Sequence, residues 1–269
     1  MHKKFFPAYL LILVNVLGFT ILLPVLPFIV VEDFGAPEYV YGLLLSSYSF
    51  FQFIGAPSLG RLSDSKGRKK ILLISQVGTL LSWIIFGLSY LLPVTFLGIV
   101  GFPLIIIAFS RMLDGVTGGN TPVAEAYIAD ITTPEEKKYI FSYTGGIAGI
   151  GLILGPGLGG LAASTETLGS KGAIIFAGVV SLITLISIQF FLKESLPLEK
   201  RRPYVKESFS SNFRLYRRII KLNPPKIIKQ IFLLKALFHT MMSTYISTIV
   251  LFMIERFSFT EKTMGAFML

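Results

Sequence analysis

The feature that most constrains this chain is a succession of long apolar runs, each at or above the ~20 residues that a helix needs to cross a bilayer. Hydrophobic residues make up 53% of the 269 residues and charged residues 15%, whereas soluble domains average about a quarter charged residues. The first run is too long to be the apolar part of a cleavable signal. The sequence therefore predicts an all-α polytopic membrane protein. The runs lie at 5–31, 39–60, 71–92, 97–123, 139–164, 171–192 and 230–254, and Gly265 to Leu269 begins an eighth.

Lysine and arginine are unevenly distributed among the segments between these runs. The N-terminus carries two, residues 61–70 carry five, 137–138 two and 193–229 eleven, so that 20 of the 25 lie in alternate segments. Because positive loops stay on the cytoplasmic side, this asymmetry predicts a cytoplasmic N-terminus in the inner or plasma membrane. Attraction to anionic lipids would reinforce that orientation. The net charge of +10 is therefore explained by topology, and no nucleic-acid partner is expected.

Few residue patterns in this chain suit catalysis or a bound cofactor. The sequence contains no cysteine, which excludes metal–thiolate chemistry. We find no cluster of histidine and carboxylate residues with metal-ligand spacing at the ends of the runs. We therefore expect no enzyme activity, no metal and no cofactor.

The densest charge lies between the second and third runs, in the stretch from Gly60 to Leu72, "GRLSDSKGRKKIL". We expect residues 61–70 to form a cytoplasmic loop, in which Gly60 and Gly67 permit a tight reversal. Basic side chains such as Arg68 and Lys69 can reach lipid phosphates there. Asp64 does nothing for orientation, and we expect it to cap a helix terminus or to bind an arginine. The alternative is an ordinary solvated positive loop.

The fourth run carries two ionisable residues deep within it. At about 100° per residue, one helix face holds Arg111, Asp114, Gly118, Pro122 and Glu125. Because an unpaired charge at that depth is costly, Arg111 and Asp114 should pair and face the interior or a water-filled cavity. We favour a functional role for this pair over a purely structural one.

The fifth run contains three glycines at intervals of four residues, Gly151, Gly155 and Gly159, followed by Gly160. Small residues at this spacing let a neighbouring helix approach closely. Pro156 removes a backbone hydrogen bond and favours a kink. The motif is expected to serve helix packing, and its position within an apolar helix argues against a phosphate-binding loop.

Isolated polar residues in other runs are weaker candidates. Asn15 in the first run and Tyr48 and Gln52 in the second could line a substrate path, although interhelical hydrogen bonding is the alternative for each. In the seventh run, Lys235 and His239 share a helix face, and we expect His239 to be packed or hydrogen-bonded rather than a proton relay.

Three of these patterns, in this order, resemble motifs of the major facilitator superfamily, in its tetracycline-resistance-like group of drug/proton antiporters. They are Gly60-x-Leu62-Ser63-Asp64-x-x-Gly67-Arg68-Lys69-Lys70, Arg111-x-x-Asp114-Gly115 and Gly151-x-x-x-Gly155-Pro156-x-x-Gly159-Gly160. The sequence departs from the usual motifs at Ser65 and Lys66, and at Asp114, where the family usually has glutamine. It also has Asn15 where similar tetracycline exporters often have an acid.

The resemblance implies a domain organisation. Residues 1–192 would form the N-terminal six-helix bundle and 193–229 a cytoplasmic connector, while 230–269 would form the seventh helix and the start of the eighth. An apolar stripe in the connector predicts an amphipathic helix on the membrane surface (Phe209, Phe213, Tyr216 and Ile220). The second bundle is expected to be incomplete in 269 residues. Three explanations are open: the sequence is a fragment, it is a truncated product, or it is one part of a split transporter. In the last case a second polypeptide would supply the missing half.

The resemblance implies secondary active transport. We expect proton-coupled efflux of a small amphipathic or drug-like compound by alternating access, in which Arg111 takes part in proton coupling. An importer of another small solute with the same fold is an alternative. A seven-helix receptor or retinal protein is suggested by the helix count and by Lys235. A membrane-bound enzyme is the third class, for which the residues offer little support.

Overall fold

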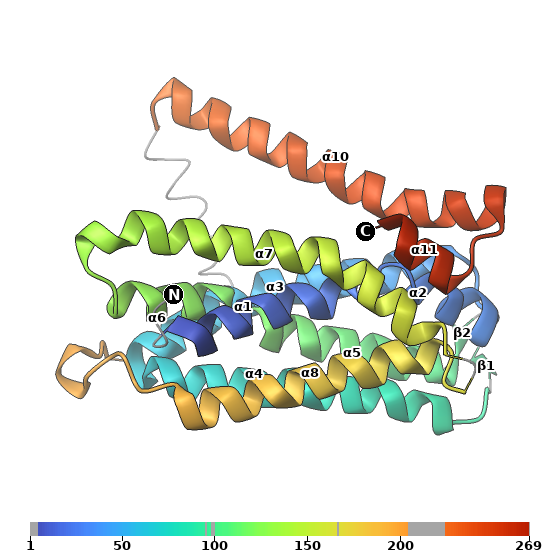
Figure 1. Ribbon diagram of the computed structural model, residues 1–269, viewed down its shortest axis with the longest axis horizontal. Coiled ribbons are helices and arrows are strands. Elements are labelled where there is room, and N and C mark those ends of the chain that lie inside the picture. The colour runs from blue at the N-terminus through green and yellow to red at the C-terminus, as the bar shows by residue number, and fades with distance from the viewer. Residues whose placement is uncertain (1–4, 95, 98–99, 166, 204–223, 269) are drawn as a thin grey trace. The chain divides into compact units, whose positions relative to one another are not determined.

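The computed structural model describes residues 5–94, 96–97, 100–165, 167–203 and 224–268. The chain divides into two compact units, of which the first is Met1–Tyr204 with Phe259–Leu269 and the second is Val205–Ser258. Figure 1 shows the long helices of the first unit lying side by side. The described elements of the first unit are α1 (Phe6–Thr20), α2 (Leu26–Phe28), the π-helical turn η2 (Ile29–Asp33), α3 (Tyr39–Lys66), α4 (Arg68–Leu88), the 3₁₀ turn η3 (Ser89–Leu91), β1 (Phe96–Leu97), β2 (Val100–Gly101), α5 (Phe102–Gly118), α6 (Thr121–Asp130), α7 (Pro134–Ala163), α8 (Ser170–Phe191), the 3₁₀ turn η4 (Leu198–Lys200) and α11 (Glu261–Met268).

The first apolar run is not one continuous helix, in contrast to the prediction of a span over residues 5–31. The α-helix ends at Thr20, and turns bonded from residue i to i−3, such as Leu23 N to Thr20 O, follow before α2 and η2. Pro24 and Pro27 lie in this segment, and neither can donate the backbone hydrogen bond that a regular helix requires.

The fourth apolar run also differs from the predicted single helix over 97–123. It begins with the short antiparallel pair β1–β2, continues as α5, breaks at Gly119 and Asn120, and ends as α6 at Asp130. Arg111 and Glu125 lie on opposite sides of the break, so the continuous helical period on which their predicted shared face rests does not run from one to the other.

Local sequence accounts for the start of α7. Thr133 accepts a hydrogen bond from the Glu136 backbone N–H at 3.4 Å, while the Glu136 carboxylate accepts one from the Thr133 backbone N–H at 3.2 Å. This capping box satisfies two N–H groups that a helix start otherwise leaves unpaired. Pro134 at the first helical position suits the same end.

Each long helix of the first unit packs against at least one other long helix. The most extensive packing joins α3 with α5, and α1 packs on α7 and α8, while α4 packs on α5 and α8. An apolar cluster fills the bundle where α1, α4 and α7 begin and α3, α6 and α8 end. Its largest buried members include Phe5, Leu11, Leu72 and Ile128.

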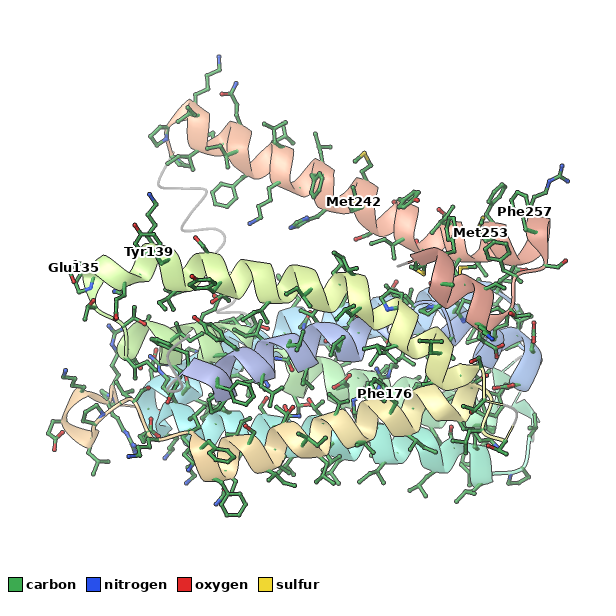
Figure 2. The ribbon with its side chains drawn as sticks, in the orientation of Figure 1. Glu135, Tyr139, Phe176, Met242, Met253 and Phe257 are labelled. Atoms are coloured by element: carbon green, nitrogen blue, oxygen red, sulfur yellow. The ribbon has the colours of Figure 1, made fainter. Side chains whose placement is uncertain are left out.

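The exterior of the first unit is apolar as well. Ile153 on α7, Ile183 on α8 and Phe190 on α8 are among the large apolar side chains that it exposes, and Figure 2 shows the side chains along these helices. By length and composition, five helical segments of the described chain could cross a membrane, namely Arg68–Leu91, Phe102–Asp130, Pro134–Ala163, Ser170–Phe191 and Lys226–Phe257. Apolar surfaces on both sides of a helix are expected where the helix meets lipid outside and a core inside.

The second unit contains one described helix, α10 (Lys226–Phe257). It is longer than the predicted run at 230–254, and it carries Lys235 and His239. Its hydroxyl groups bond within the helix, as in the hydrogen bond from Thr244 Oγ1 to Thr240 O at 2.9 Å. The amphipathic helix predicted from Phe209 to Ile220 lies outside the described residues.

Candidate functional site

Arg111 and Asp114 form an ion pair inside the first unit. Both lie on the buried face of α5, where one turn of helix brings their side chains together. Arg111 Nη1 lies 3.2 Å from Asp114 Oδ2, and the two side chains are 3% and 5% exposed. Arg111 Nη2 lies 3.5 Å from Ser110 Oγ. The pair predicted from spacing alone is thus present and sealed from solvent.

Two aromatic rings of α4 complete the surroundings of the arginine. The Arg111 guanidinium carbon lies 4.5 Å from the centre of the Trp83 ring and 5.1 Å from that of the Phe86 ring. A cation over an aromatic face is stabilised by the ring quadrupole, and by more when water is excluded. Sequence reasoning missed Trp83 and Phe86, because an aromatic residue within an apolar run looks like any core residue.

The break between α5 and α6 exposes two backbone carbonyls that side chains satisfy. Pro122 has no N–H to donate to Gly118 O, and the Gln52 side-chain amide lies 3.5 Å from that oxygen. Ser75 Oγ on α4 donates to Thr117 O at 2.5 Å. The hydrogen bonds of α6 start again from Asn120 O. The break is therefore built into the packing of α3 and α4.

Asn120 at the break joins three helices through its side chain. It accepts a hydrogen bond from the Asn15 amide on α1 and donates one to Ser75 Oγ on α4. Asn15 therefore makes the interhelical hydrogen bond that was the alternative to a substrate-path role. The motif of an asparagine before Thr121 and Pro122 within an apolar run could have indicated both the break and this junction.

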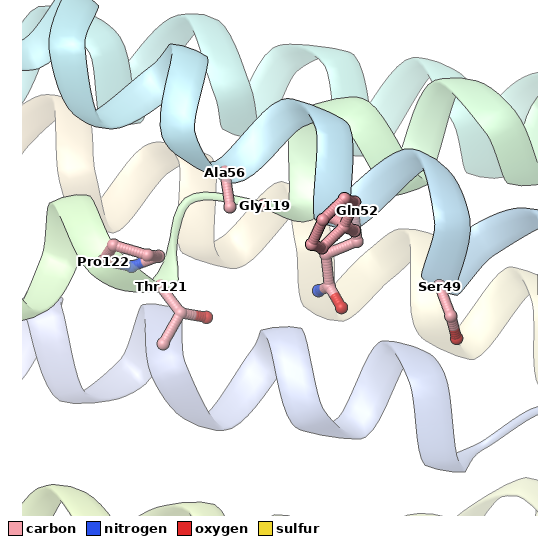
Figure 3. A pocket seen from close by; sticks show the side chains of 7 residues that line it. Ser49, Gln52, Ala56, Gly119, Thr121 and Pro122 are labelled. Carbon is pink, nitrogen blue, oxygen red and sulfur yellow. The ribbon is translucent and has the colours of Figure 1, made fainter. Parts of the chain in front are cut away.

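The three substrate-path candidates line one pocket of about 320 Å³. Asn15, Tyr48 and Gln52 contribute to its wall, and Phe19 stacks on Tyr48 with ring centres 5.5 Å apart. The remaining lining residues are Val16, Thr20, Ser49, Thr121 and Leu152. A second pocket of about 330 Å³ shares Ser49, Gln52 and Thr121 and extends to the helix break. Figure 3 shows the side chains that line this second pocket.

Tyr48 lies between the first pocket and the ion pair. A Cβ atom added at Gly118 would lie 3.4 Å from Tyr48 Oη and 3.7 Å from Asp114 Oδ1, so the phenol and the carboxylate are close neighbours. Each pocket is lined by amide, hydroxyl, aromatic and aliphatic groups, and none of these described lining residues is charged. An uncharged cavity lined by hydrogen-bonding groups therefore lies near the buried pair of Asp114 and Arg111.

The charged stretch between α3 and α4 is not the ten-residue loop that was predicted. The helix α3 continues to Lys66 and α4 starts at Arg68, so a single residue, Gly67, joins them. Gly67 has φ +99°, a conformation that residues with a side chain rarely adopt. Gly60 lies within α3, and a Cβ atom added there would meet nothing within 4 Å. Of these two glycines, only Gly67 makes the reversal.

Arg68 forms ion pairs with two carboxylates at this junction. Its guanidinium lies 2.7 Å from Asp64 and 3.1 Å from Asp130 at the end of α6, and it donates to Ser63 Oγ at 2.5 Å. Asp64 therefore binds an arginine, which was one of its two expected roles. Lys69 donates to Gln189 O at the end of α8 at 2.8 Å. Arg68 is buried in these contacts, contrary to the expectation that it reaches lipid phosphates, whereas that expectation stays a prediction for the partly exposed Lys69.

The segment after α8 folds back onto the same junction. Glu194 Oε1 accepts a hydrogen bond from the Arg68 backbone N–H at 2.8 Å, which satisfies a donor at the start of α4. Arg201 lies 3.7 Å from Glu194, and the Arg202 backbone N–H donates to Asp64 O at 3.0 Å. Sequence reasoning did not single out Asp130 or Glu194, since each lies more than 60 residues from Arg68 along the chain.

The glycines of α7 lie against two other helices. Cβ atoms added at Gly151, Gly155 and Gly159 would collide with Val16, Thr20 and Ile21, at or just after α1. Gly160, in contrast, faces Gly265 of α11, where an added Cβ would lie 2.6 Å from the Gly265 Cα. Pro156 lies inside the continuous helix α7. The small residues thus allow close backbone approach on two sides of α7.

Comparison with known proteins yields consistent matches. Residues 8–269 match the sequence model of the Major Facilitator Superfamily. The chain is 32% identical to the tetracycline resistance protein, class H, of Pasteurella multocida. The alignment spans 197 residues and covers 72% of this chain and 46% of the relative. It is 32% identical over 258 residues to multidrug resistance protein 2 of Bacillus subtilis (strain 168), covering 95% of this chain and 59% of the relative.

A solved structure has a similar fold. The crystal structure of the human organic anion transporter MFSD10 (TETRAN) matches with a TM-score of 0.72 and 25% identity, over 99% of this chain and 68% of that one. The chain spans about half the length of the curated relatives it matches. The chain belongs to the Major Facilitator Superfamily, and the predictions of that family and of an all-α polytopic membrane protein are confirmed.

Proposed function

We propose that this member of the superfamily takes part in proton-coupled efflux of small amphipathic compounds by alternating access. The uncharged pocket would receive the compound, Asp114 would gain and lose the proton beside the charged Arg111, and Tyr48 would connect the pocket with this pair. Asn15 and Gln52 would hydrogen-bond to the compound or to the helices around it. No cofactor is needed for this scheme.

The observation that carries the proposal is a single buried acid beside an uncharged cavity. Asp114 is sealed with one arginine, so gain or loss of one proton changes the net charge of a region that water does not reach. Such a change is energetically large in a low-dielectric interior. It can therefore bias which arrangement of helices is preferred, which is what coupling of transport to protons requires.

The named relatives agree with export of drug-like compounds. Two relatives are named for resistance to tetracycline and to multiple drugs. Because a structural match is an organic anion transporter, organic anions should be tested as well. Because the chain covers about half of the curated relatives, substrate, direction and coupling are proposals for this protein.

The charged and glycine-rich motifs have supporting roles in this scheme. The junction of Gly67, Arg68 and Asp64 would fix α3 and α4 to each other at the cytoplasmic end, near anionic lipids. The close approach of α1 to α7 along Gly151, Gly155 and Gly159 would let these helices move as one body. We retain the division into a bundle at 1–192, a connector at 193–229 and a second part from 230 as part of the proposal.

Transport in proteoliposomes tests the function. The product of the complete gene would be reconstituted, a pH gradient imposed, and movement of tetracycline, a lipophilic cation and an organic anion measured. We expect one of these compounds to move against the proton flux, and Asp114→Asn to abolish the dependence on the gradient. Asp64→Asn is the matched control, since it removes a carboxylate outside the pocket. Transport that needs no proton gradient, or that runs with the proton flux, would contradict antiport.

Labelling of introduced cysteines tests the orientation. Lys66 and Glu32 are both exposed and lie at opposite ends of the bundle, and the chain has no native cysteine. With a cytoplasmic N-terminus, an impermeant thiol reagent should label Glu32→Cys but not Lys66→Cys in intact cells. Labelling of position 66 alone would reverse the topology.

A further inference from the structure

We propose that Trp83 is the positioning residue for Arg111, and that its indole face holds the guanidinium in place whether or not Asp114 carries its charge. The inference deepens the proposed function, since it rests on Asp114 as the group that gains and loses the proton. It assigns a role to an aromatic residue that belongs to none of the family-like motifs in the sequence.

The rings form a platform on one side of the arginine. Trp83 and Phe86 lie three residues apart on α4, so they share one helix face. Their planes are nearly parallel, with an angle of 3° and centres 6.2 Å apart. The Arg111 guanidinium carbon lies 4.5 Å from the Trp83 ring centre and 5.1 Å from that of Phe86. The guanidinium is therefore nearer to the indole than to the phenyl ring.

The polar partners of Arg111 are few for a cation with five N–H donors. One nitrogen contacts Asp114 at 3.2 Å, and a second reaches Ser110 only at 3.5 Å. Arg111 Nε has no hydrogen-bond partner within the described residues. The titratable groups that face Arg111 are Asp114 on α5 and Tyr48 on α3. Asp114 is thus the one carboxylate that balances the charge.

Protonation of Asp114 would remove that balance. The attraction between a cation and an aromatic face comes from the ring quadrupole, which does not change with pH. The platform therefore retains the guanidinium when the carboxyl group is neutral. Without the platform, Arg111 could turn toward the hydrogen-bonding groups of the pocket, where it would repel cationic compounds and obstruct the cavity.

Packing from two other helices fixes the indole itself. Trp83 is 3% exposed. A Cβ atom added at Gly18 of α1 would lie 3.5 Å from the indole Cζ2, and one added at Gly178 of α8 would lie 3.7 Å from the Trp83 Cβ. The α1 and α8 backbones thus lie close to Trp83, and a buried ring in a close-packed interior can hold the charge in one position.

The chain offers a direct spectroscopic test, since Trp83 is its single tryptophan. Indole fluorescence responds to the electric field of a nearby charge, so the emission of the 269-residue chain in lipid nanodiscs reports on Arg111. We would compare the wild type with Arg111→Gln, Arg111→Met and Asp114→Asn. Lys171→Gln is the matched control, because Lys171 lies over a different ring, that of Tyr90, at 5.2 Å.

We expect Arg111→Gln and Arg111→Met to shift the emission maximum or change its intensity, while Lys171→Gln leaves the wild-type spectrum. Asp114→Asn should give a spectrum distinct from that of Arg111→Gln, because its arginine remains over the indole. Far-UV circular dichroism and size-exclusion chromatography establish that each variant is folded. An Arg111→Gln spectrum equal to the wild type would overturn the contact, and Arg111→Met, which also removes the charge, gives the same test if the glutamine variant does not fold. An Asp114→Asn spectrum equal to that of Arg111→Gln would show that the carboxylate, not the indole, holds the arginine. Absence of proton-driven transport would leave these spectra unaffected, so the two proposals fail separately.

Discussion

Arg68 and Arg111 are both buried arginines of the first unit, yet their charges are balanced in different ways. Arg68 has two carboxylates, Asp64 and Asp130, whose side chains are 38% and 25% exposed. Arg111 has one carboxylate, Asp114, which is 5% exposed, together with the rings of α4. The first group lies where helices end, and the second lies within the bundle.

Under the proposed function, this difference separates a structural junction at Arg68 from a proton-sensitive pair at Arg111. At Arg68, water reaches the acids and screens them, and the loss of one acid leaves another. At Arg111, no second carboxylate among the described residues compensates, and removal of one partner leaves a buried charge without its counter-charge. Changes at Arg68 should therefore be graded and should affect stability, whereas changes at Arg111 should be close to all-or-none and should affect transport.

The largest effect is expected for Arg111→Ala. The substitution leaves Asp114 buried without a cation, so the acid should become neutral and stop exchanging protons. We expect proton-driven transport by the complete gene product to fall by about 100-fold or more, while binding of the compound persists in part. The measurement is transport under an imposed pH gradient, beside equilibrium binding. Gradient-driven transport at the wild-type rate would remove the contrast between the two arginines.

Arg68→Ala should lower stability rather than abolish coupling. It removes hydrogen bonds to Ser63, Asp64 and Asp130 and leaves the two acids close together. We expect a loss of about 1–3 kcal/mol in the free energy of unfolding, measured by denaturant titration in detergent. Lys70→Ala, at an exposed position of the same helix, should change stability by no more than about 0.5 kcal/mol. Equal effects of the two substitutions would mean that the Arg68 contacts contribute nothing.

Gly67→Ala should destabilise the same junction through the backbone. Its positive φ is strained for alanine at a cost of order 1 kcal/mol, and the added Cβ would crowd the side chains of Glu194 and Arg201. Gly60→Ala is the control, with an effect of opposite sign. Because Gly60 is helical and has open space around it, this substitution should raise the free energy of unfolding by up to about 1 kcal/mol. Thermal unfolding of both variants measures the difference. A stabilised Gly67→Ala variant would contradict the assigned conformation.

Asp64→Asn should have the smallest effect. The Asp64 side chain is 38% exposed, and Asp130 remains beside Arg68. We therefore expect the free energy of unfolding to fall by about 0.2–1 kcal/mol. The loss should shrink in high salt, since exposed charges are screened. Unfolding at two salt concentrations measures this dependence. If the effect were large and independent of salt, Asp64 would resemble Asp114, and the comparison would fail.

Sequence reasoning found those parts of the site that lie on one helix. Asp114 follows Arg111 by three residues, and helix geometry alone brings such side chains together. The spacing of Gly151, Gly155 and Gly159 likewise fixes a common face. The long apolar runs fixed the membrane class and the helical content. Each of these inferences needs only the period of the helix.

The tertiary structure decided which helices meet and in what register. Asp130, Glu194 and the Trp83 platform were not anticipated, since contacts between distant segments depend on how whole helices pack. The local sequence around Asn120 indicates a possible break, but the partners that stabilise the break depend on packing: Ser75 and Gln52, on two other helices, donate hydrogen bonds to its freed carbonyls. A buried carbonyl must find a donor, and which side chain supplies it is settled by packing rather than by the local sequence.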